Sequence, residues 1–263
     1  MLYYFCNMPK RVIYLIFAFI LFACSDEDPK QIKKEIVVKE IITPIAENPK
    51  LDLITNDNVV ERLTKYGEEN LETIALITTS KGVIKIRLFK DTPLHRANFI
   101  LQAKSGYFNG CYFSRVVKGF MAQFGGSYGD QQKAIQDSIG YYTIPSEMSK
   151  HHFHKKGAVA AARSYTDNPD KRSEPDELYF VEGSQFSIFS LEKYAEENHY
   201  TYSETQKNYY LKNKGAAHLD GEHTVFGEII EGLSVVSKLT DVATDSQDWP
   251  KDNLYVEKVE ILN

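Results

Sequence analysis

The chain has 263 residues, of which 43% are apolar and 25% are charged, a composition that excludes an intrinsically disordered protein. Its net charge of −5 excludes the basic stripe that a nucleic-acid-binding protein carries. The length fits one domain with appendages or two small domains. The 17 tyrosines and 15 phenylalanines favour β-strands and a well-filled core.

Residues 1–23 predict a lipoprotein signal peptide. Lys10 and Arg11 precede the apolar run 12–23, which is shorter than the roughly 20 residues that span a bilayer and fits a secretory signal. The run ends in Leu-Phe-Ala-Cys24 and resembles a bacterial lipoprotein signal, so we expect Cys24 to become the lipidated N-terminus. An uncleaved anchor is the alternative. Ser25 and the acidic residues after it resemble signals for the outer membrane, on its periplasmic or its surface face.

The three cysteines agree with this interpretation. Cys6 leaves with the signal peptide and Cys24 carries lipid, so Cys111 has no partner for an intramolecular disulfide. No nearby motif supplies a base that would activate Cys111, and we therefore expect a buried small hydrophobic residue.

Residues 24–70 predict a lipidated N-terminus and an extended tether. This segment has three prolines and mixed charge, a composition that buries little apolar area. Residues 58–69 fit one short helix with Asp57 as its N-cap, and a disordered spacer is the alternative.

The domain proper, residues 71–263, begins with a β-hairpin and a helix. Residues 74–79 and 83–89 flank a Ser-Lys-Gly turn, the pattern of a hairpin. Thr92-Pro93 then opens a helix, because proline suits its first position, and Gly106 ends it.

Residues 112–126 organise the rest of the chain. They predict a strand, a Lys-Gly turn and a second short strand. Alternation places Arg115 on the same strand face as Phe113 and Val117. An arginine on such a face indicates either a side chain with its head in water or a functional site.

Several later blocks predict further elements. Residues 157–163 are small and allow a close approach to the backbone, and residues 183–189 predict a strand that starts from a Gly-Ser bend. Residues 218–227 predict a tight turn that enters a strand, residues 231–239 a closing helix, and residues 256–262 a final strand.

Two segments read as insertions. Residues 164–182 predict a polar loop, and residues 190–216 contain a helix that begins with a capping box at Ser203 and Gln206. Both insertions flank the blocks above, so they either shape substrate choice or are decoration.

In this order, the blocks resemble the cyclophilin family of peptidyl-prolyl cis-trans isomerases. The matching stretches are Phe113-Ser-Arg115-Val with Gly119-Phe-Met-Ala-Gln123, Gly157–Arg163, Gly183-Ser-Gln-Phe186 and Leu219–Gly227. The resemblance covers residues 71–263. It implies a mainly β fold, a closed eight-stranded antiparallel β-barrel capped by two helices, here with a helical insertion. It also implies isomerase activity on proline-containing polypeptides, without a metal or another cofactor.

The resemblance assigns roles by position. Arg115 matches the catalytic arginine, and Gln123 matches the residue that orients it. The remaining residues match the proline pocket, the groove for the substrate backbone and the pocket rim: Phe120, Met121, Leu219, Ala162, Arg163, Gln185 and His223.

The chain departs from the family pattern at two positions. Ser187 stands where relatives usually carry an aromatic residue two positions after the matched Gln185, which would remove part of the pocket floor unless Phe189 leans in. His218 stands where many relatives carry tryptophan, which puts sensitivity to cyclosporin in doubt.

The implied chemistry needs no covalent step. Rotation about a prolyl peptide bond must overcome about 18–20 kcal/mol and takes tens to hundreds of seconds without a catalyst. A guanidinium beside the amide binds the twisted state more tightly than the planar state, which lowers this barrier. Arginine suits the role because it stays charged and offers a rigid fork of donors.

Two polar clusters have competing explanations. His151-His-Phe-His154 indicates a metal site or a loop, and we favour the loop. Asp220, Glu222 and His223 indicate an acid–base cluster or an Asp-Gly turn, and we favour the turn.

Three functional hypotheses follow. The first is an active prolyl isomerase, monomeric and tethered to the cell envelope, that acts on exported proteins. The second is a peptide-binding or chaperone module with little turnover, because Ser187 loosens the pocket. The third is a surface lipoprotein whose function lies in its insertions.

Overall fold

The computed structural model describes residues 53–263, so the predicted signal peptide, Cys24 and most of the tether lie outside the described residues. The helices are α1 (Val59–Glu69), α2 (Pro93–Lys104), α3 (Asp130–Ile139), α4 (Ile188–Glu197), α5 (Glu204–Tyr210), α6 (Leu233–Thr240) and the short 3₁₀ helix η1 (Ala217–Leu219). The strands are β1 (Ile74–Thr79), β2 (Gly82–Leu88), β3 (Phe113–Val117), β4 (Met121–Gly125), β5 (Ala158–Ala161), β6 (Glu177–Val181), β7 (Val225–Glu231) and β8 (Val256–Leu262).

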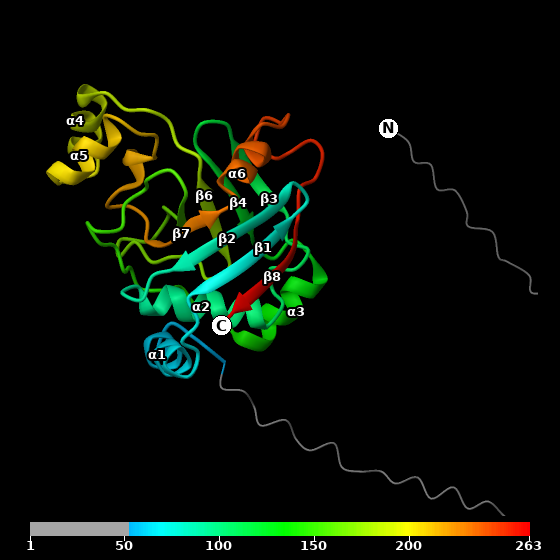
Figure 1. Cartoon of the computed structure of the whole chain (residues 1–263). Coiled ribbons are helices and arrows are strands. Elements are labelled where there is room, and N and C mark those ends of the chain that lie inside the picture. The colour runs from blue at the N-terminus through cyan, green and yellow to red at the C-terminus, as the bar shows by residue number, and fades with distance from the viewer. Residues whose placement is uncertain (1–52) are drawn as a thin grey trace, which may run out of the picture. The chain divides into compact units, whose positions relative to one another are not determined.

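The strands form one antiparallel sheet in the order β3-β4-β6-β5-β7-β2-β1-β8. The sheet curls into a half-barrel (Figure 1). Backbone hydrogen bonds join its two edges: Phe113 N–H donates to Leu254 O at 2.9 Å, and Val256 N–H donates to Cys111 O at 2.8 Å. The predicted eight antiparallel strands are confirmed. The predicted closed barrel is only partly formed, because a few bonds near the starts of β3 and β8 join the two edges at this seam and no continuous ladder connects the two strands.

The inside of the curled sheet holds the main core. In Figure 1, α2 lies at one end of the sheet and α6 at the other. Phe99 and Ile100 of α2 share one buried cluster with Val236 and Leu239 of α6 and with Ile86 of β2. Each such side chain contributes about 1.5–3 kcal/mol through burial. The two predicted capping helices therefore complete the core from both ends.

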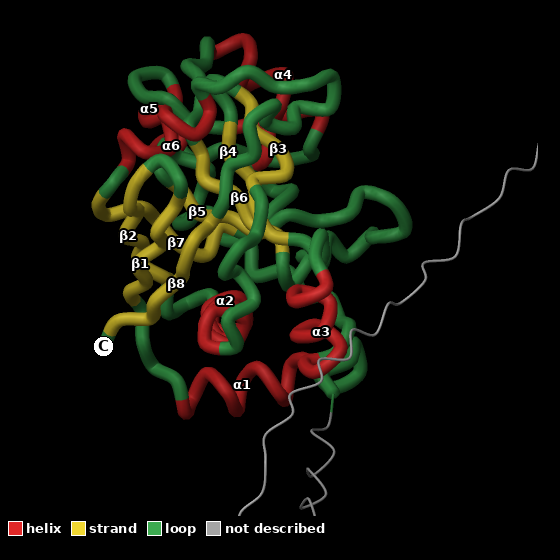
Figure 2. Tube along the Cα trace, turned by 90° about the vertical axis from the view of Figure 1, so that its right-hand side faces the viewer, coloured by secondary structure: helices red, strands yellow, loops and turns green. Residues whose placement is uncertain are grey.

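Helix α1 packs onto α2. In both views α2 lies between the sheet and α1 (Figures 1 and 2), and Leu63 of α1 is buried against Leu94 of α2. The guanidinium of Arg96 donates to Gly67 O at 2.9 Å and Asn70 O at 2.7 Å, which satisfies carbonyls at the end of α1. The described part of the predicted tether is thus folded against the domain. Its N-cap is Asn58, one residue after the predicted Asp57.

Helix α3, helix α4 and strand β6 were not predicted. Helix α3 lies between residues 126 and 157, a stretch for which the sequence analysis named no element, and its Ile135 packs against the main core. Strand β6 lies inside the segment 164–182 that we expected to be a loop, and it pairs with both β4 and β5. The loop prediction for its second half was therefore wrong, because Leu178 and Phe180 belong to the core.

The prediction of a strand over residues 183–189 is also wrong. Ser184 forms only an isolated bridge with Gly215, and Ser187 is the N-cap of α4. Helices α4 and α5 form the predicted helical insertion, whose own small core includes Leu191, and the capping box at the start of α5 is confirmed.

Two further observations complete the fold. Cys111 is buried, as predicted, and burial together with Asp176 raises the pKa of its thiol to about 12. None of the helices within residues 53–263 is long and apolar enough to cross a bilayer.

Candidate active site

A cavity of about 180 Å³ lies between β3, β4, β5, β6 and the turn after η1. Every residue predicted for the catalytic and substrate-binding site lines it, except Gln185 and Ser187. The full lining consists of Arg115, Phe120, Met121, Gln123, Ala162, Arg163, Tyr165, Glu177, Tyr179, Leu219 and His223.

The cavity has an apolar wall. Met121, Ala162, Tyr179 and Leu219 belong to one buried cluster, with Phe120 packed against it. Ala162, which directly follows β5, contributes a small side chain to this wall. The wall offers a seat for a compact apolar ring.

Arg115 stands at the edge of the cavity. Its side chain is 47% exposed, and its Nε–H donates to Asp248 Oδ2 at 3.1 Å. The guanidinium carbon lies 5.9 Å from the centre of the Phe120 ring. Val116 N–H donates to Asp248 O at 2.9 Å, which ties the Asp248 loop to β3. No hydrogen bond engages the two amino groups of Arg115 within residues 53–263, so both remain available to a ligand.

Gln123 lies opposite Arg115 in the β3–β4 ladder, but its amide points elsewhere. Its Nε2 donates to Glu177 Oε2 at 3.0 Å. The hydrogen bond that holds the arginine therefore comes from Asp248, a residue that the sequence analysis did not single out.

Glu177 and Tyr179 of β6 were also missed. They stand two residues apart and both line the cavity, whereas Gln185 and Ser187 lie outside it. The aromatic residue that the family pattern places two positions after its groove residue is therefore present as Tyr179. The apparent defect at Ser187 does not exist, because Ser187 caps α4 by accepting from Ser190 N–H at 3.1 Å.

Glu177 has unusual electrostatics. Burial raises the pKa of Glu177 to about 7, and the neighbouring Asp176 and Glu174 add to the rise. The hydrogen bond from Gln123 acts in the opposite direction. Glu177 is therefore divided between its protonated and ionised forms near neutral pH.

His223 is a neutral rim residue. Burial, together with His154, lowers the pKa of His223 to about 3. Its Nδ1 lies 3.1 Å from Ala161 O, and its Nε2 lies 2.8 Å from the Tyr165 hydroxyl. The neutral ring therefore donates from Nδ1 to the carbonyl and accepts from Tyr165 at Nε2.

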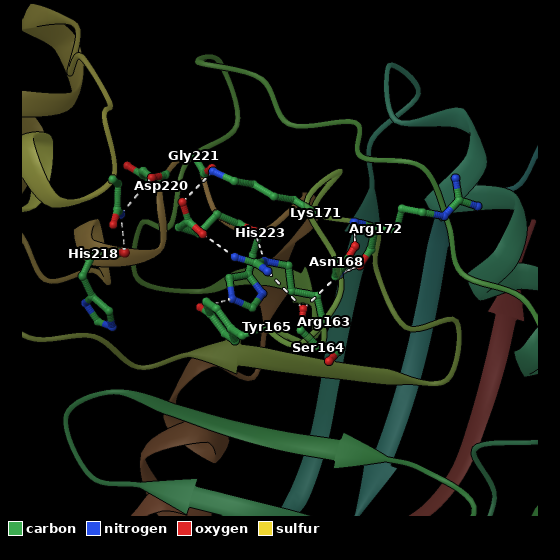
Figure 3. A network of polar contacts seen from close by, with 12 residues as sticks. Arg163, Ser164, Tyr165, Asn168, Lys171, Arg172, His218, Asp220, Gly221 and His223 are labelled. Carbon is green, nitrogen blue, oxygen red and sulfur yellow. Dashed lines mark hydrogen bonds and ion pairs between the residues drawn. The ribbon is translucent and has the colours of Figure 1, made fainter.

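Ion pairs, a hydrogen bond and a stacking contact hold the loop after β5 beside His223 (Figure 3). Glu222 pairs with Arg163 and, at 2.6 Å, with Lys171, whose Nζ also donates to Gly221 O at 2.7 Å. The Arg163 guanidinium stacks over the Tyr165 ring at 3.9 Å. These contacts fix Tyr165 at the cavity rim.

Behind the cavity wall lies a buried polar chain. Asp220 Oδ1 accepts from His154 N–H at 2.9 Å and lies 2.7 Å from His154 Nδ1, while His154 Nε2 lies 3.0 Å from the Tyr179 hydroxyl. Asp220 Oδ2 accepts from the Tyr210 hydroxyl at 2.7 Å. This series of hydrogen bonds links Tyr210 of α5, in the insertion, to Tyr179 in the cavity.

The polar clusters singled out in the sequence are dispersed. His152 pairs with Asp91 at 2.8 Å and stacks on Phe89, whereas the buried His154 contacts Asp220. Asp220, Glu222 and His223 each bind different partners, and their segment is the predicted turn. Among the described residues, no His, Cys, Asp or Glu cluster is fit to hold a metal ion.

His218, at the position of the family's tryptophan, packs against Phe120. The two ring centres are 4.9 Å apart, and the ring centre of Tyr194 of α4 lies 5.5 Å from that of His218. The insertion therefore supports the pocket rim through His218.

Comparison with known proteins agrees with this geometry. A protein of Helicobacter pylori named peptidyl-prolyl cis-trans isomerase is 33% identical over 169 residues, which cover 63% of this chain and 78% of that protein. A protein of Staphylococcus saprophyticus named after the same activity is 29% identical over 208 residues, covering 76% of this chain and all of its own length.

Two crystal structures of a cyclophilin-type isomerase from Cryptosporidium parvum share the fold, at 18% identity and TM-scores of 0.50 and 0.51. They cover 72% and 73% of this chain and 99% and 98% of their own, and one was determined in the presence of the dipeptide Ala-Pro. The family model described as "Cyclophilin type peptidyl-prolyl cis-trans isomerase/CLD" matches residues 73–261. The chain therefore belongs to the cyclophilin-type peptidyl-prolyl cis-trans isomerases.

Proposed function

We propose that this chain isomerises prolyl bonds of exported polypeptides at the bacterial cell envelope, and that Arg115 stabilises the twisted amide. One observation carries the catalytic part. The Arg115 guanidinium stands beside the apolar wall of the cavity, with its amino groups unengaged by the described residues.

The apolar wall would bind the substrate's proline ring. Phe120, Met121, Tyr179 and Leu219 supply the contact area, and the floor that Ser187 appeared to lack comes from Tyr179. A ring held here fixes one side of the peptide bond while the other side rotates. The alternative of a weakly active module rested on a missing aromatic residue, and Tyr179 occupies that place in the cavity.

Arg115 would act on the amide itself. Rotation removes the nitrogen lone pair from resonance with the carbonyl, so a charged donor beside the amide binds the twisted state best. A hydrogen bond to a charged group contributes about 1.5–3 kcal/mol, or roughly 10- to 100-fold in rate. Asp248 would hold the guanidinium by its Nε–H and leave the amino groups for the substrate.

Measuring the isomerisation of a proline-containing peptide by the purified full chain tests this mechanism. Arg115→Ala should lower kcat/KM by roughly 100-fold, while a fluorescent peptide still binds within a few-fold of the wild-type affinity. Lys118→Ala is the matched control, because it removes a neighbouring cation that pairs with Asp241 outside the cavity. Equal rates for wild type and Arg115→Ala would refute the role of Arg115.

The envelope part of the proposal rests on residues 1–24. Replacing Cys24 by serine should abolish the incorporation of labelled palmitate and move the protein from the membrane fraction to the soluble fraction. Protease treatment of intact cells then identifies the face of the membrane. Unchanged labelling of Cys24→Ser would refute lipidation at this residue.

A further inference from the structure

Some of the charged residues that line the candidate active site have an oppositely charged partner, and one has none. Arg115 pairs with Asp248, and Arg163 pairs with Glu222. Glu177, by contrast, accepts a hydrogen bond from the neutral amide of Gln123, and no cation among the described residues forms an ion pair with it. The cavity therefore contains one carboxyl group without a counter-charge.

Two more acidic residues stand directly behind Glu177. Glu174 and Asp176 precede it in the same segment, which the Asn98 amide holds by donating to Pro175 O at 2.7 Å. Burial raises the pKa of both carboxyl groups, and Asp176 also raises that of Glu174. The Tyr107 hydroxyl donates to Asp176 at 2.6 Å, but neither residue has a basic partner within the described part of the chain.

The acidic segment continues from the active-site cavity into a second cavity. The second cavity has a volume of about 360 Å³ and is lined by Glu174 and Asp176. A small space lies next to both cavities, because Glu177 also lines the first cavity and Glu174 also lines the second. Gln136 lines this second cavity and is only 3% exposed, and its Oε1 has no hydrogen-bond partner among residues 53–263. The acidic segment therefore lines both cavities, with Glu177 in the first and with Glu174 and Asp176 in the second.

We propose that Glu177, with Glu174 and Asp176 behind it, makes this isomerase select polypeptides that carry a lysine or arginine side chain close to the isomerised proline. An ammonium or guanidinium group brings several donors and the missing positive charge. Since the carboxyl groups are partly buried, the attraction is screened less than on an open surface. The inference rests on the proposed function, because it assumes that the proline binds in the first cavity.

The preference should depend on pH. Glu177 faces Gln123 on β4, Asp176 and Glu174 on its own segment, and Tyr128 beyond β4, while Arg115 and Arg163 line the same cavity with their own carboxylate partners. Because the pKa of Glu177 is about 7, its carboxyl is mostly protonated at pH 6 and mostly ionised at pH 8. The selection of cationic side chains should therefore grow over this interval.

The test uses a set of proline peptides in which one position on either side of the proline is lysine, glutamine or glutamate. The purified full chain is assayed for kcat/KM, and the affinity of labelled versions of the same peptides is measured separately. At pH 8 we expect the best lysine peptide to exceed its glutamine counterpart by roughly fivefold and the glutamate peptide to fall below both. At pH 6 the ratio of lysine to glutamine should approach one.

Variants separate the acidic segment from general charge. Glu177→Gln and Glu174→Gln should each reduce the lysine-to-glutamine ratio at pH 8, whereas Glu257→Gln, an exposed acid on β8, should leave the ratio unchanged. Equal values for lysine and glutamine peptides in the wild type at pH 8, or a ratio that survives in Glu177→Gln, would overturn the inference. If no peptide is turned over, the proposed function fails, and the ratio of the binding affinities still decides the preference.

Discussion

Replacing Asp220 by alanine is expected to destabilise the whole domain, although Asp220 does not line the candidate active site. The carboxylate is 2% exposed. It accepts from His154 N–H at 2.9 Å and from Tyr210 O–H at 2.7 Å, and lies 2.7 Å from His154 Nδ1. The Gln206 amide approaches it at 3.5 Å. Alanine would leave these buried donors without an acceptor.

The size of the effect follows from those contacts. Each unsatisfied buried donor costs about 1–3 kcal/mol, and Asp220 accepts from or contacts several such donors. Because part of the loss relaxes when water enters the space, we expect the free energy of unfolding to fall by about 3–5 kcal/mol. This is a large share of the 5–15 kcal/mol that typically stabilises a domain. Asp220→Asn keeps one acceptor and should lose less.

Urea unfolding of the full chain, followed by circular dichroism and by the fluorescence of the single tryptophan, Trp249, measures the change. Asp252→Ala removes an exposed carboxylate and serves as the control. A loss below about 1 kcal/mol for Asp220→Ala would show that the donors find other acceptors, and would refute the reasoning. An increase in the exposure of Tyr179 to solvent, with little change in unfolding, would instead confine the effect to the cavity wall.

Three further predictions follow. Folding takes up a proton at Glu177, because its pKa rises from 4.5 to about 7 in the folded state, so stability should fall as the pH rises through that window. In urea unfolding, Glu177→Gln should therefore stabilise the domain by up to about 3 kcal/mol at pH 8 and by little at pH 4.5. Equal effects at both pH values would show that the raised pKa of Glu177 is not the cause. Cys111, in a chain with Cys6 and Cys24 replaced by serine, should react with a thiol reagent at pH 8 only after unfolding, since it is buried and its pKa is about 12; rapid labelling of the native protein would contradict this. Leu63→Ala should lower the free energy of unfolding by about 2–5 kcal/mol, and no loss would show that α1 is not part of the folded unit.

Local signals predicted the elements that depend on neighbouring residues. The hairpins β1–β2 and β3–β4 follow from alternation and from turns at Gly82 and Gly119, both of which have positive φ angles. Helix α2 follows from Pro93 at its start and from Gly106 at its end. In these cases the residues that define the element are adjacent in the chain.

The predicted strand was misplaced because a family motif was given more weight than the pattern of hydrophobic residues. Gly183-Ser-Gln-Phe186 matches the family's groove motif in letters, but it connects β6 to α4. The run Leu178–Val181 was the real signal, because a short apolar run between polar segments is typical of a buried central strand.

Other parts of the site have no local signal at all. Asp248 and Arg115 are distant in the chain and meet only because the loop before β8 folds back along β3. The pairing of Gln123 with Glu177 similarly depends on the β4–β6 register. Such contacts are set by the three-dimensional arrangement of strands and cannot be found from spacing alone.

The pairing of β1 with β8 has a consequence for biosynthesis. Ile74, near the start of the domain, pairs with Leu262, and the seam closes against Leu254 and Val256. A chain still emerging from a ribosome lacks the strand that covers the β1 edge. An exposed strand edge can pair with other chains, and this edge stays open until β8 has been made. Contacts this distant in sequence also make folding slow, which extends the period of risk.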